Sequence, residues 1–274
     1  MMRLRFAVLL AIGALASGCA TTGAGHEASV SPNAPAPQRE TAHDARIDRD
    51  ARTRIAREDT LTQMTFWAAE YSAHPEDLEA AQKFAEALRA GGRNDRAAEV
   101  AREALGRHDG DRPLLTSLGL ALLSANHPQE ALQPLALVAH ADAQDWRSRC
   151  ALGVALDQLG RSDEARRAYQ EALAIRPEEP SVLTNLGVSY LLGGDAAQAE
   201  TILRRAVAAP NAPVAARQNL ALAVGLQGRF DEAEQLERID LPPAAVAQNM
   251  SFIRDLLSDG RRWSDVGERD VRRQ

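Results

Sequence analysis

The sequence contains few of the residues and motifs on which enzymes depend. Its 274 residues include only two cysteines and one lysine, and aromatic residues make up 4%. It contains no glycine-rich phosphate loop, no Cys-x-x-Cys pair, no His-Glu-x-x-His and no Gly-x-Ser-x-Gly motif. The six histidines have no spacing typical of metal ligands. We therefore expect neither catalysis nor a metal ion or organic cofactor.

The sequence also has no excess of basic charge. It carries 32 Lys and Arg residues against 38 Asp and Glu, a net charge of −6. Loss of Arg3 and Arg5 with a leader segment would leave 30 against 38, or −8. Proteins that bind nucleic acid, or that lie on an anionic lipid surface, present a basic face. The charge balance therefore argues against both kinds of partner.

The apolar run at the start of the chain is too short to cross a bilayer. The run 6–16 has 11 residues and, at about 1.5 Å per residue, reaches about 16 Å against the roughly 30 Å of a hydrocarbon core. Arg3 and Arg5 precede it, and Ser17 and Gly18 follow it. A charged start, a short apolar core and a small-residue exit are the parts of a bacterial export signal, so 1–18 is predicted to be a signal peptide.

Cys19 follows this signal directly. The stretch LASGC resembles a lipobox, in which the cysteine is acylated before cleavage, although Ala16 stands where leucine is usual. Two interpretations remain: a lipoprotein anchored through Cys19, which we favour, or an ordinary secreted protein. Because Ala20 is not aspartate, the resemblance implies a lipid-anchored protein on the periplasmic face of the outer membrane. With Cys19 acylated, Cys150 has no disulfide partner and is predicted to be a partly buried helix residue.

Two segments separate the cysteine from the rest of the chain. Residues 19–43 have no apolar period and are rich in Ala, Pro, Ser, Thr and Gly, which predicts a disordered tether. The segment 44–77 is predicted to be an N-terminal capping helix or half repeat. One helix is expected over about 45–72, because apolar residues recur there at helical spacing. They are Leu61, Met64, Ala68 and Tyr71.

The strongest signal in the chain is a period of 34 residues, in which three positions recur over five periods without an insertion. They are an alanine column (Ala97, Ala131, Ala165, Ala199, Ala233), a glycine or asparagine column (Gly92, Asn126, Gly160, Gly194, Gly228) and a large apolar column (Leu88, Leu122, Leu156, Tyr190, Val224). A Leu-Gly pair, as at Leu152 and Gly153, recurs in the same frame. Such a period is typical of stacked supersecondary units.

Each position in this period has a physical role in a pair of helices. The large apolar residue lies on one face of the first helix, and the glycine or asparagine tolerates positive φ where that helix ends. The alanine lies where the two helices cross, since a small side chain allows their axes to approach closely. Suitable N-caps for the second helix are Asn94, Ser162, Asp195 and Asp231.

A 34-residue helix-turn-helix unit with these positions and a closing proline resembles the tetratricopeptide repeat (TPR). The clearest unit is 146–179, with Tyr169 and Pro177 at the family's positions. The resemblance implies an all-α fold, a right-handed superhelix (α-solenoid) with terminal capping helices. The predicted parts of the body are five units within 78–247 (78–111, 112–145, 146–179, 180–213, 214–247), a capping helix over 248–259 and a flexible tail over 260–274. Glu237 and Asp240 depart from the family pattern in the last unit.

The first helices of stacked TPR units line a concave groove, so the resemblance implies a site for a polypeptide. The predicted peptide-binding residues, chosen by their position in the repeat, are Leu120, Arg147, Val154, Asp157, Thr184, Asn185, Val188, Leu191, Gln218, Asn219 and Leu222. Asn185 and Asn219 hold one repeat position, where an amide can donate to and accept from a peptide backbone. The leucines and valines either form an apolar floor or pack between helices. The Lys/Arg clamp of chaperone-binding TPR domains is absent.

The last fifth of the chain carries a more specific resemblance. Together with the lipobox-like start, the stretch 217–257 (RQNLALAVGLQGRFDEAEQLERIDLPPAAVAQNMSFIRDLL) is similar to the TadD family of TPR lipoproteins in tight-adherence (Flp) pilus assembly. That resemblance implies a pilotin-like, non-enzymatic scaffold whose partner is an outer-membrane secretin or another pilus assembly component. The alternative is a TPR lipoprotein adaptor that regulates cell-wall synthases or proteases in the envelope.

The alanine column provides a test of the repeat frame. Replacing Ala199 with Trp is expected to overpack the helix crossing and lower the free energy of unfolding by about 1–3 kcal/mol or more. Thermal unfolding followed by circular dichroism measures this effect, and an unchanged midpoint would refute the placement of Ala199.

Overall fold

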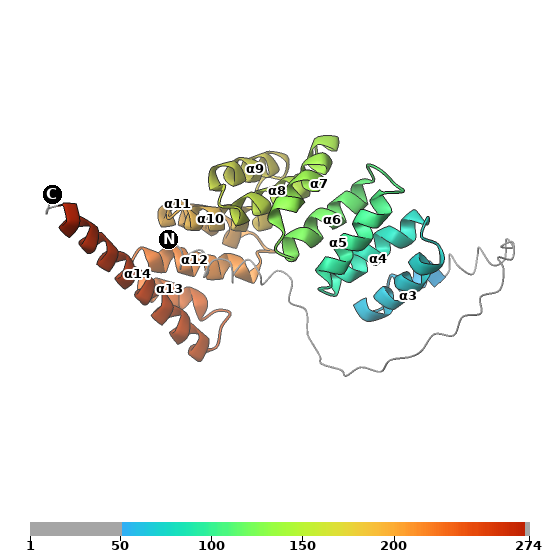
Figure 1. The fold of residues 1–274 in the computed structure, drawn as a ribbon. Helices are drawn as coiled ribbons and strands as arrows, with labels where there is room; N and C mark the ends of the chain where they lie inside the picture. Colours follow the sequence, from blue (N-terminus) through green and yellow to red (C-terminus); the bar gives the residue numbers. More distant parts are fainter. Residues whose placement is uncertain (1–50, 272–274) are drawn as a thin grey trace, which may run out of the picture. The chain divides into compact units, whose positions relative to one another are not determined.

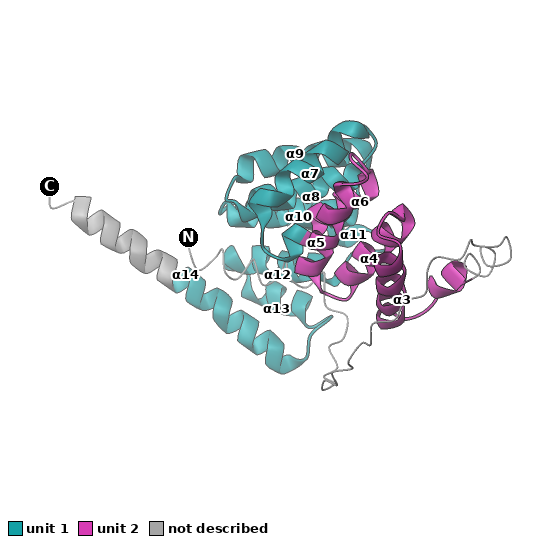
Figure 2. Cartoon of the chain, turned by 45° about the vertical axis from the view of Figure 1, so that its right-hand side comes forward, with its two compact units in different colours: residues 1–15, 122–274 teal, residues 16–121 magenta. Residues whose placement is uncertain are grey.

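The computed structural model describes residues 51–271, and the side chains of residues 51–258 (Figure 1). All regular elements within this range are helices, which confirms the predicted all-α class. The signal peptide, Cys19 and the tether of 19–43 lie outside the described residues and stay predictions. The chain divides into two compact units, which Figure 2 colours differently: unit 1 (1–15 and 122–274) and unit 2 (16–121).

Unit 2 contains the N-terminal helices. They are a short helix at 51–55, α3 (Thr60–Ala73), α4 (Leu78–Ala90), α5 (Asn94–Leu105) and most of α6 (Arg112–Ser124). The prediction of a single helix over 45–72 was wrong, because the helix is interrupted at 56–59. Asp59 caps α3 by accepting hydrogen bonds from the backbone N–H groups of Leu61 (2.9 Å) and Thr62 (3.0 Å). Leu61 is 67% exposed, so it does not share the buried face of Tyr71.

Arg52 holds the short first helix against α3 and α4. Its guanidinium donates to Glu70 (2.7 Å) and Glu79 (2.9 Å) and pairs with Asp77 (2.7 Å). It also lies 5.6 Å from the ring centroid of Trp67. Three carboxylates around one largely buried guanidinium form a network, which is stronger than an isolated surface pair. These contacts fix the start of the described chain to unit 2.

Unit 1 contains three complete helix pairs between α7 (Pro128–Ala141) and α14 (Pro243–Val271). The pairs are α8 (Trp146–Gln158) with α9 (Ser162–Ile175), α10 (Pro180–Leu192) with α11 (Ala196–Ala208), and α12 (Val214–Leu226) with α13 (Phe230–Glu237). Each pair falls within one predicted 34-residue unit. The capping helix expected over 248–259 is longer at both ends, because α14 begins at Pro243 and continues through 260–271, where a flexible tail was expected.

The glycine or asparagine column forms the turn inside each pair. All five of its members have positive φ, between 62° and 84°, as predicted. With this conformation at Gly160, the backbone N–H of Arg161 reaches the carbonyl of Leu156 (2.8 Å) and satisfies an open acceptor at the end of α8. Asn126 is the single non-glycine member, and asparagine tolerates this region better than most residues do.

The N-caps of the second helices follow from this turn. Each capping residue directly follows the glycine or asparagine of the column. The predicted cap at Asp195 is confirmed, because its side chain accepts a hydrogen bond from the Gln198 N–H (3.0 Å). The caps predicted at Asn94, Ser162 and Asp231 were wrong, because these residues already lie within the first helical turn. The residues at the cap position are Arg93, Arg161 and Arg229, whose side chains make no capping hydrogen bond.

The helices of a pair cross at close range because small residues lie at the crossing. All five members of the alanine column have no exposed surface. A Cβ atom placed on Gly153 would lie 2.5 Å from the ring of Tyr169, and one on Gly187 would lie 2.5 Å from Cγ of Leu203. The large side chain of the second helix therefore packs directly on the backbone of the first helix.

Replacing Gly153 with Ala is expected to destabilise the protein by about 1–3 kcal/mol through overpacking against Tyr169. This effect opposes the gain of about 1 kcal/mol that alanine normally brings to a helix. Urea unfolding measures the change. Gly91→Ala serves as the control, because its Cβ would meet no atom closer than 3.4 Å. Equal stability of the Gly153 variant and the wild type would contradict the packing described.

Candidate protein-binding face

Ten of the eleven predicted peptide-binding residues lie on three neighbouring helices of unit 1. α8 packs on α10, and α10 packs on α12, so the first helices of successive pairs lie side by side. We call the surface that these three helices share the first-helix face. The eleventh residue, Leu120, lies on α6 in unit 2, where it is half-buried.

The ten residues differ in how much surface they offer to a partner. Arg147 is exposed, and four others are half-buried: Val154, Asn185, Gln218 and Leu222. The remaining five are buried: Asp157, Thr184, Val188, Leu191 and Asn219. The first five side chains can therefore contact a partner directly. Contact with the other five would require the surrounding side chains to rearrange. That these residues bind a peptide stays a prediction.

The apolar residues of the first-helix face also pack in the hydrophobic core. Val188 and Leu191 are 3% and 0% exposed and belong to a core cluster that also contains Leu220 and Met250. Leu222 packs against the same cluster while it keeps part of its surface. The sequence left open whether these side chains form a floor or pack between helices, and for Val188 and Leu191 the structure shows packing.

Asn185 links two of the three helices through Cys150. Its side-chain amide donates to the sulfur at 3.3 Å. Cys150 is buried and free, and burial raises the pKa of its thiol to about 11. A thiol that stays protonated at neutral pH is not a nucleophile. Cys150 therefore has a structural role, and Asn185 has one donor fewer for a peptide.

Asp157 is the centre of a buried polar network that joins three helices. Its carboxylate accepts hydrogen bonds from the hydroxyl groups of Tyr169 on α9 (3.1 Å) and Ser189 on α10 (2.9 Å). The side chain is 8% exposed, and this burial raises its pKa to about 6. From the repeat position alone Asp157 was expected in the groove. The sequence carried no signal for the network, because its partners come from two other helices.

The raised pKa of Asp157 predicts a pH-dependent stability. Between about pH 4 and pH 6 the folded state binds more protons than the unfolded state, so this contribution to stability is lost as the pH rises through about 6. A pKa raised to about 6 in the folded state makes this loss about 3 kcal/mol. Urea unfolding of wild type and Asp157→Asn from pH 4 to pH 8 measures it. The stability of the variant relative to wild type should rise with pH by that amount.

The exposed Asp109→Asn provides the control for removing a carboxylate. Because this side chain is exposed, the substitution is expected to change the free energy of unfolding by no more than about 0.5 kcal/mol. A pH-independent difference between Asp157→Asn and wild type would contradict the assignment of Asp157.

The two residues of the last repeat that depart from the TPR pattern have clear contacts. Glu237 is 4% exposed, accepts a hydrogen bond from Asn249 of α14 (3.1 Å), and has a pKa raised by burial. Asp240 accepts two hydrogen bonds from Arg217 of α12 (2.6 and 2.5 Å). Glu237 therefore connects α13 to α14, and Asp240 connects the segment between these two helices to α12.

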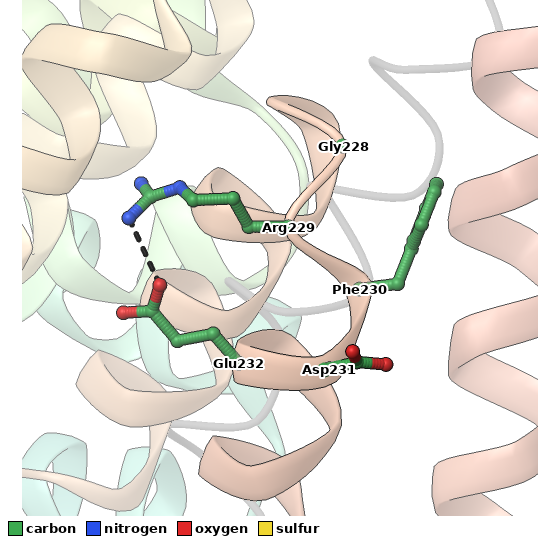
Figure 3. Close-up of a pocket in the computed structure, with 5 residues that line it drawn as sticks. All are labelled: Gly228, Arg229, Phe230, Asp231 and Glu232. Atoms are coloured by element: carbon green, nitrogen blue, oxygen red, sulfur yellow. Dashed lines mark hydrogen bonds and ion pairs between the residues drawn. The ribbon is translucent and has the colours of Figure 1, made fainter.

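A small open depression lies at the turn between α12 and α13. Gly228, Arg229, Phe230, Asp231 and Glu232 line it, and Figure 3 shows Phe230 pointing away from the Arg229–Glu232 ion pair (2.9 Å). It contains none of the predicted peptide-binding residues. Within the described part of the chain no cluster of three or more metal-ligating side chains occurs. None of the helices in that part has the length and apolar character needed to span a membrane.

Comparison with known proteins bears on the repeat architecture. The family model of the tetratricopeptide repeat matches residues 83–145 and 150–216. The solved structure of MamA 41-end from Desulfovibrio magneticus RS-1 has a TM-score of 0.55 at 22% identity, over 60% of this chain and 93% of that one. The MamA RS-1 ArsTM double mutant has a TM-score of 0.54 at 23% identity, over 60% and 92%. At these identities the likeness concerns the fold alone.

A curated relative matches a shorter stretch. The uncharacterized protein y4yS of Sinorhizobium fredii (strain NBRC 101917 / NGR234) is 34% identical over 97 residues, which make up 35% of this chain and 53% of that protein. The chain thus spans about half the length of this relative. Taken together, residues 83–145 and 150–216 match the tetratricopeptide repeat, and the described helices form an all-α scaffold of a kind that generally serves protein–protein interaction.

Proposed function

We propose that the protein is a lipid-anchored scaffold on the periplasmic face of the outer membrane, which acts as a pilotin-like factor in assembly of the Flp (tight adherence) pilus. Its partner is an outer-membrane secretin or another component of the pilus apparatus. The observation that carries the proposal is the combination of a lipobox-like Cys19 with a body of TPR helix pairs in one chain.

The stretch 217–257, which resembles the TadD family, has a defined place in unit 1. It forms most of α12, all of α13 and the first half of α14. Val246, Met250 and Ile253 of α14 are each 2% exposed and pack in the core cluster beneath α12. The stretch that carries the resemblance therefore includes the part of α14 that packs against the last helix pair. This placement is consistent with the proposed family, but it does not identify a partner.

The anchor and the body suit this role physically. Several acyl chains, at about 0.8 kcal/mol per buried methylene, hold a protein on a membrane almost permanently. A tether of about 24 residues has a root-mean-square span on the order of 25–30 Å. Such a tether keeps the TPR body close to the membrane where a secretin assembles, and leaves its surface free to contact a partner.

Removing the anchor tests the proposal. Cys19→Ala is expected to move the protein from the outer-membrane fraction to the periplasm and to lower the amount of secretin multimers and pili. Membrane fractionation and immunoblotting of undissociated multimers measure both effects. Cys150→Ala is the matched control, because it removes the other cysteine from a buried position and is expected to leave localisation unchanged.

Two outcomes would count against the proposal. Normal multimers and pili in a mislocalised Cys19→Ala strain would exclude the pilotin-like role. Unchanged localisation of the variant would exclude the lipid anchor itself.

A further inference from the structure

The first half of α14 closes the core of unit 1 against α12 and α13. Val246, Met250 and Ile253 are each 2% exposed and lie in the same core cluster as residues of α12. The contact is close, because a Cβ atom on Gly225 of α12 would lie 3.0 Å from Cγ2 of Ile253. α14 packs on α13 as well. Release of α14 would therefore expose apolar surface both on this helix and on the helices that it covers.

Glu237, the last residue of α13, places a carboxyl group inside this junction. It is 4% exposed, and its Oε1 accepts a hydrogen bond from Nδ2 of Asn249 on α14 (3.1 Å). Its Oε2 is also buried and has no hydrogen-bond partner among the described residues. An ionised carboxylate can accept about four hydrogen bonds, so ionisation at this position leaves most of that capacity unused. A protonated carboxyl group carries no charge and loses far less hydration on burial.

Among the described residues, no charged group on the neighbouring helices pairs with Glu237. Arg217, the only charged residue of α12, donates to Asp240 at 2.6 and 2.5 Å. Arg254 of α14 lies 5.2 Å from the ring centroid of Phe230, at the other end of α13. The other charged residues of α13, of its flanks and of the described side chains of α14 are exposed or paired: Arg229, Asp231, Glu232, Glu234, Arg238 and Asp255. The chain has no histidine after His140. Burial therefore raises the pKa of Glu237.

We propose that Glu237 and Asn249 form a pH-dependent latch, which holds α14 on α12 and α13 at acidic pH and releases it more readily as the carboxyl group ionises. When α14 is released, Glu237 meets water and its pKa returns to the ordinary value. Between the ordinary and the raised pKa the docked state binds more protons than the released state, so the stability of docking falls as the pH rises through that range. The pH thus controls how often unit 1 exposes this apolar surface. This regulation is separate from the proposed role in pilus assembly.

A buried thiol on α14 measures how often the helix is released. Val246→Cys is introduced into the full chain with Cys19 and Cys150 both replaced by Ala, and its rate of reaction with dithiodipyridine is measured from pH 4 to pH 8. Each rate is divided by that of a free cysteine peptide at the same pH, which removes the effect of thiol ionisation. This ratio is expected to rise with pH. Glu237→Gln keeps the shape of the protonated carboxyl group and is expected to lower the ratio about three- to tenfold at pH 8 and to remove its pH dependence.

Three further variants separate Glu237 from other groups. Asp231→Asn, at an exposed position of α13, is expected to leave the pH dependence unchanged. Asp157→Asn removes another carboxyl group whose pKa is raised by burial, and the pH dependence of the thiol reaction is expected to persist in it. Asn249→Ala removes the donor to Glu237, so it is expected to raise the ratio more at pH 8 than at pH 4. Circular dichroism verifies that each variant folds as the wild type does.

Three results would overturn the inference. They are a ratio that does not change with pH, a pH dependence that survives in Glu237→Gln, and a pH dependence that disappears in Asp157→Asn. These measurements use a chain without Cys19 and require no secretin, so a failure of the latch is distinguishable from a failure of the proposed function.

Discussion

The close approach of the two helices in each pair is the constraint from which the rest of unit 1 follows. Tyr169 packs on the backbone at Gly153, and Leu203 packs in the same way at Gly187, where a single additional carbon atom would overlap the neighbouring side chain. Fully buried alanines occupy the same crossings. Packing of this density leaves little room to adjust the crossing in these two pairs. The pairs stack so that α8 packs on α10 and α10 packs on α12.

Polar groups inside this packing have roles that a repeat pattern does not specify. Asp157 joins α8, α9 and α10 through hydroxyl donors, and Glu237 joins α13 to α14 through Asn249. A buried carboxyl group loses hydration, and each of these two has a pKa raised by burial. The hydrogen bonds offset part of that loss and favour one arrangement of the helices over others.

The second helices of the pairs in unit 1 carry more charged residues than the first helices, and several of these residues form ion pairs. Glu200 of α11 pairs with Arg204 on its own helix and with Arg229, which directly precedes α13 of the next pair, and Arg204 also pairs with Glu232 of α13. Such partly exposed pairs contribute little individually, but a network across two helices adds to the contact between repeats. The first helices carry fewer charged residues, because most of their side chains are buried.

The sequence by itself determined the all-α class, the 34-residue period, the positive φ of the glycine and asparagine column and the burial of the alanine column. Each of these depends on local conformation or on a spacing that repeats along the chain, so one sequence carries the information. The break before α3 depended on a cap at Asp59, which a helical period conceals. The exposure of Arg147 beside the burial of Asp157 was decided by the tertiary structure. Residues at equivalent repeat positions meet different neighbours across helices, and only those neighbours determine which side chains remain at the surface.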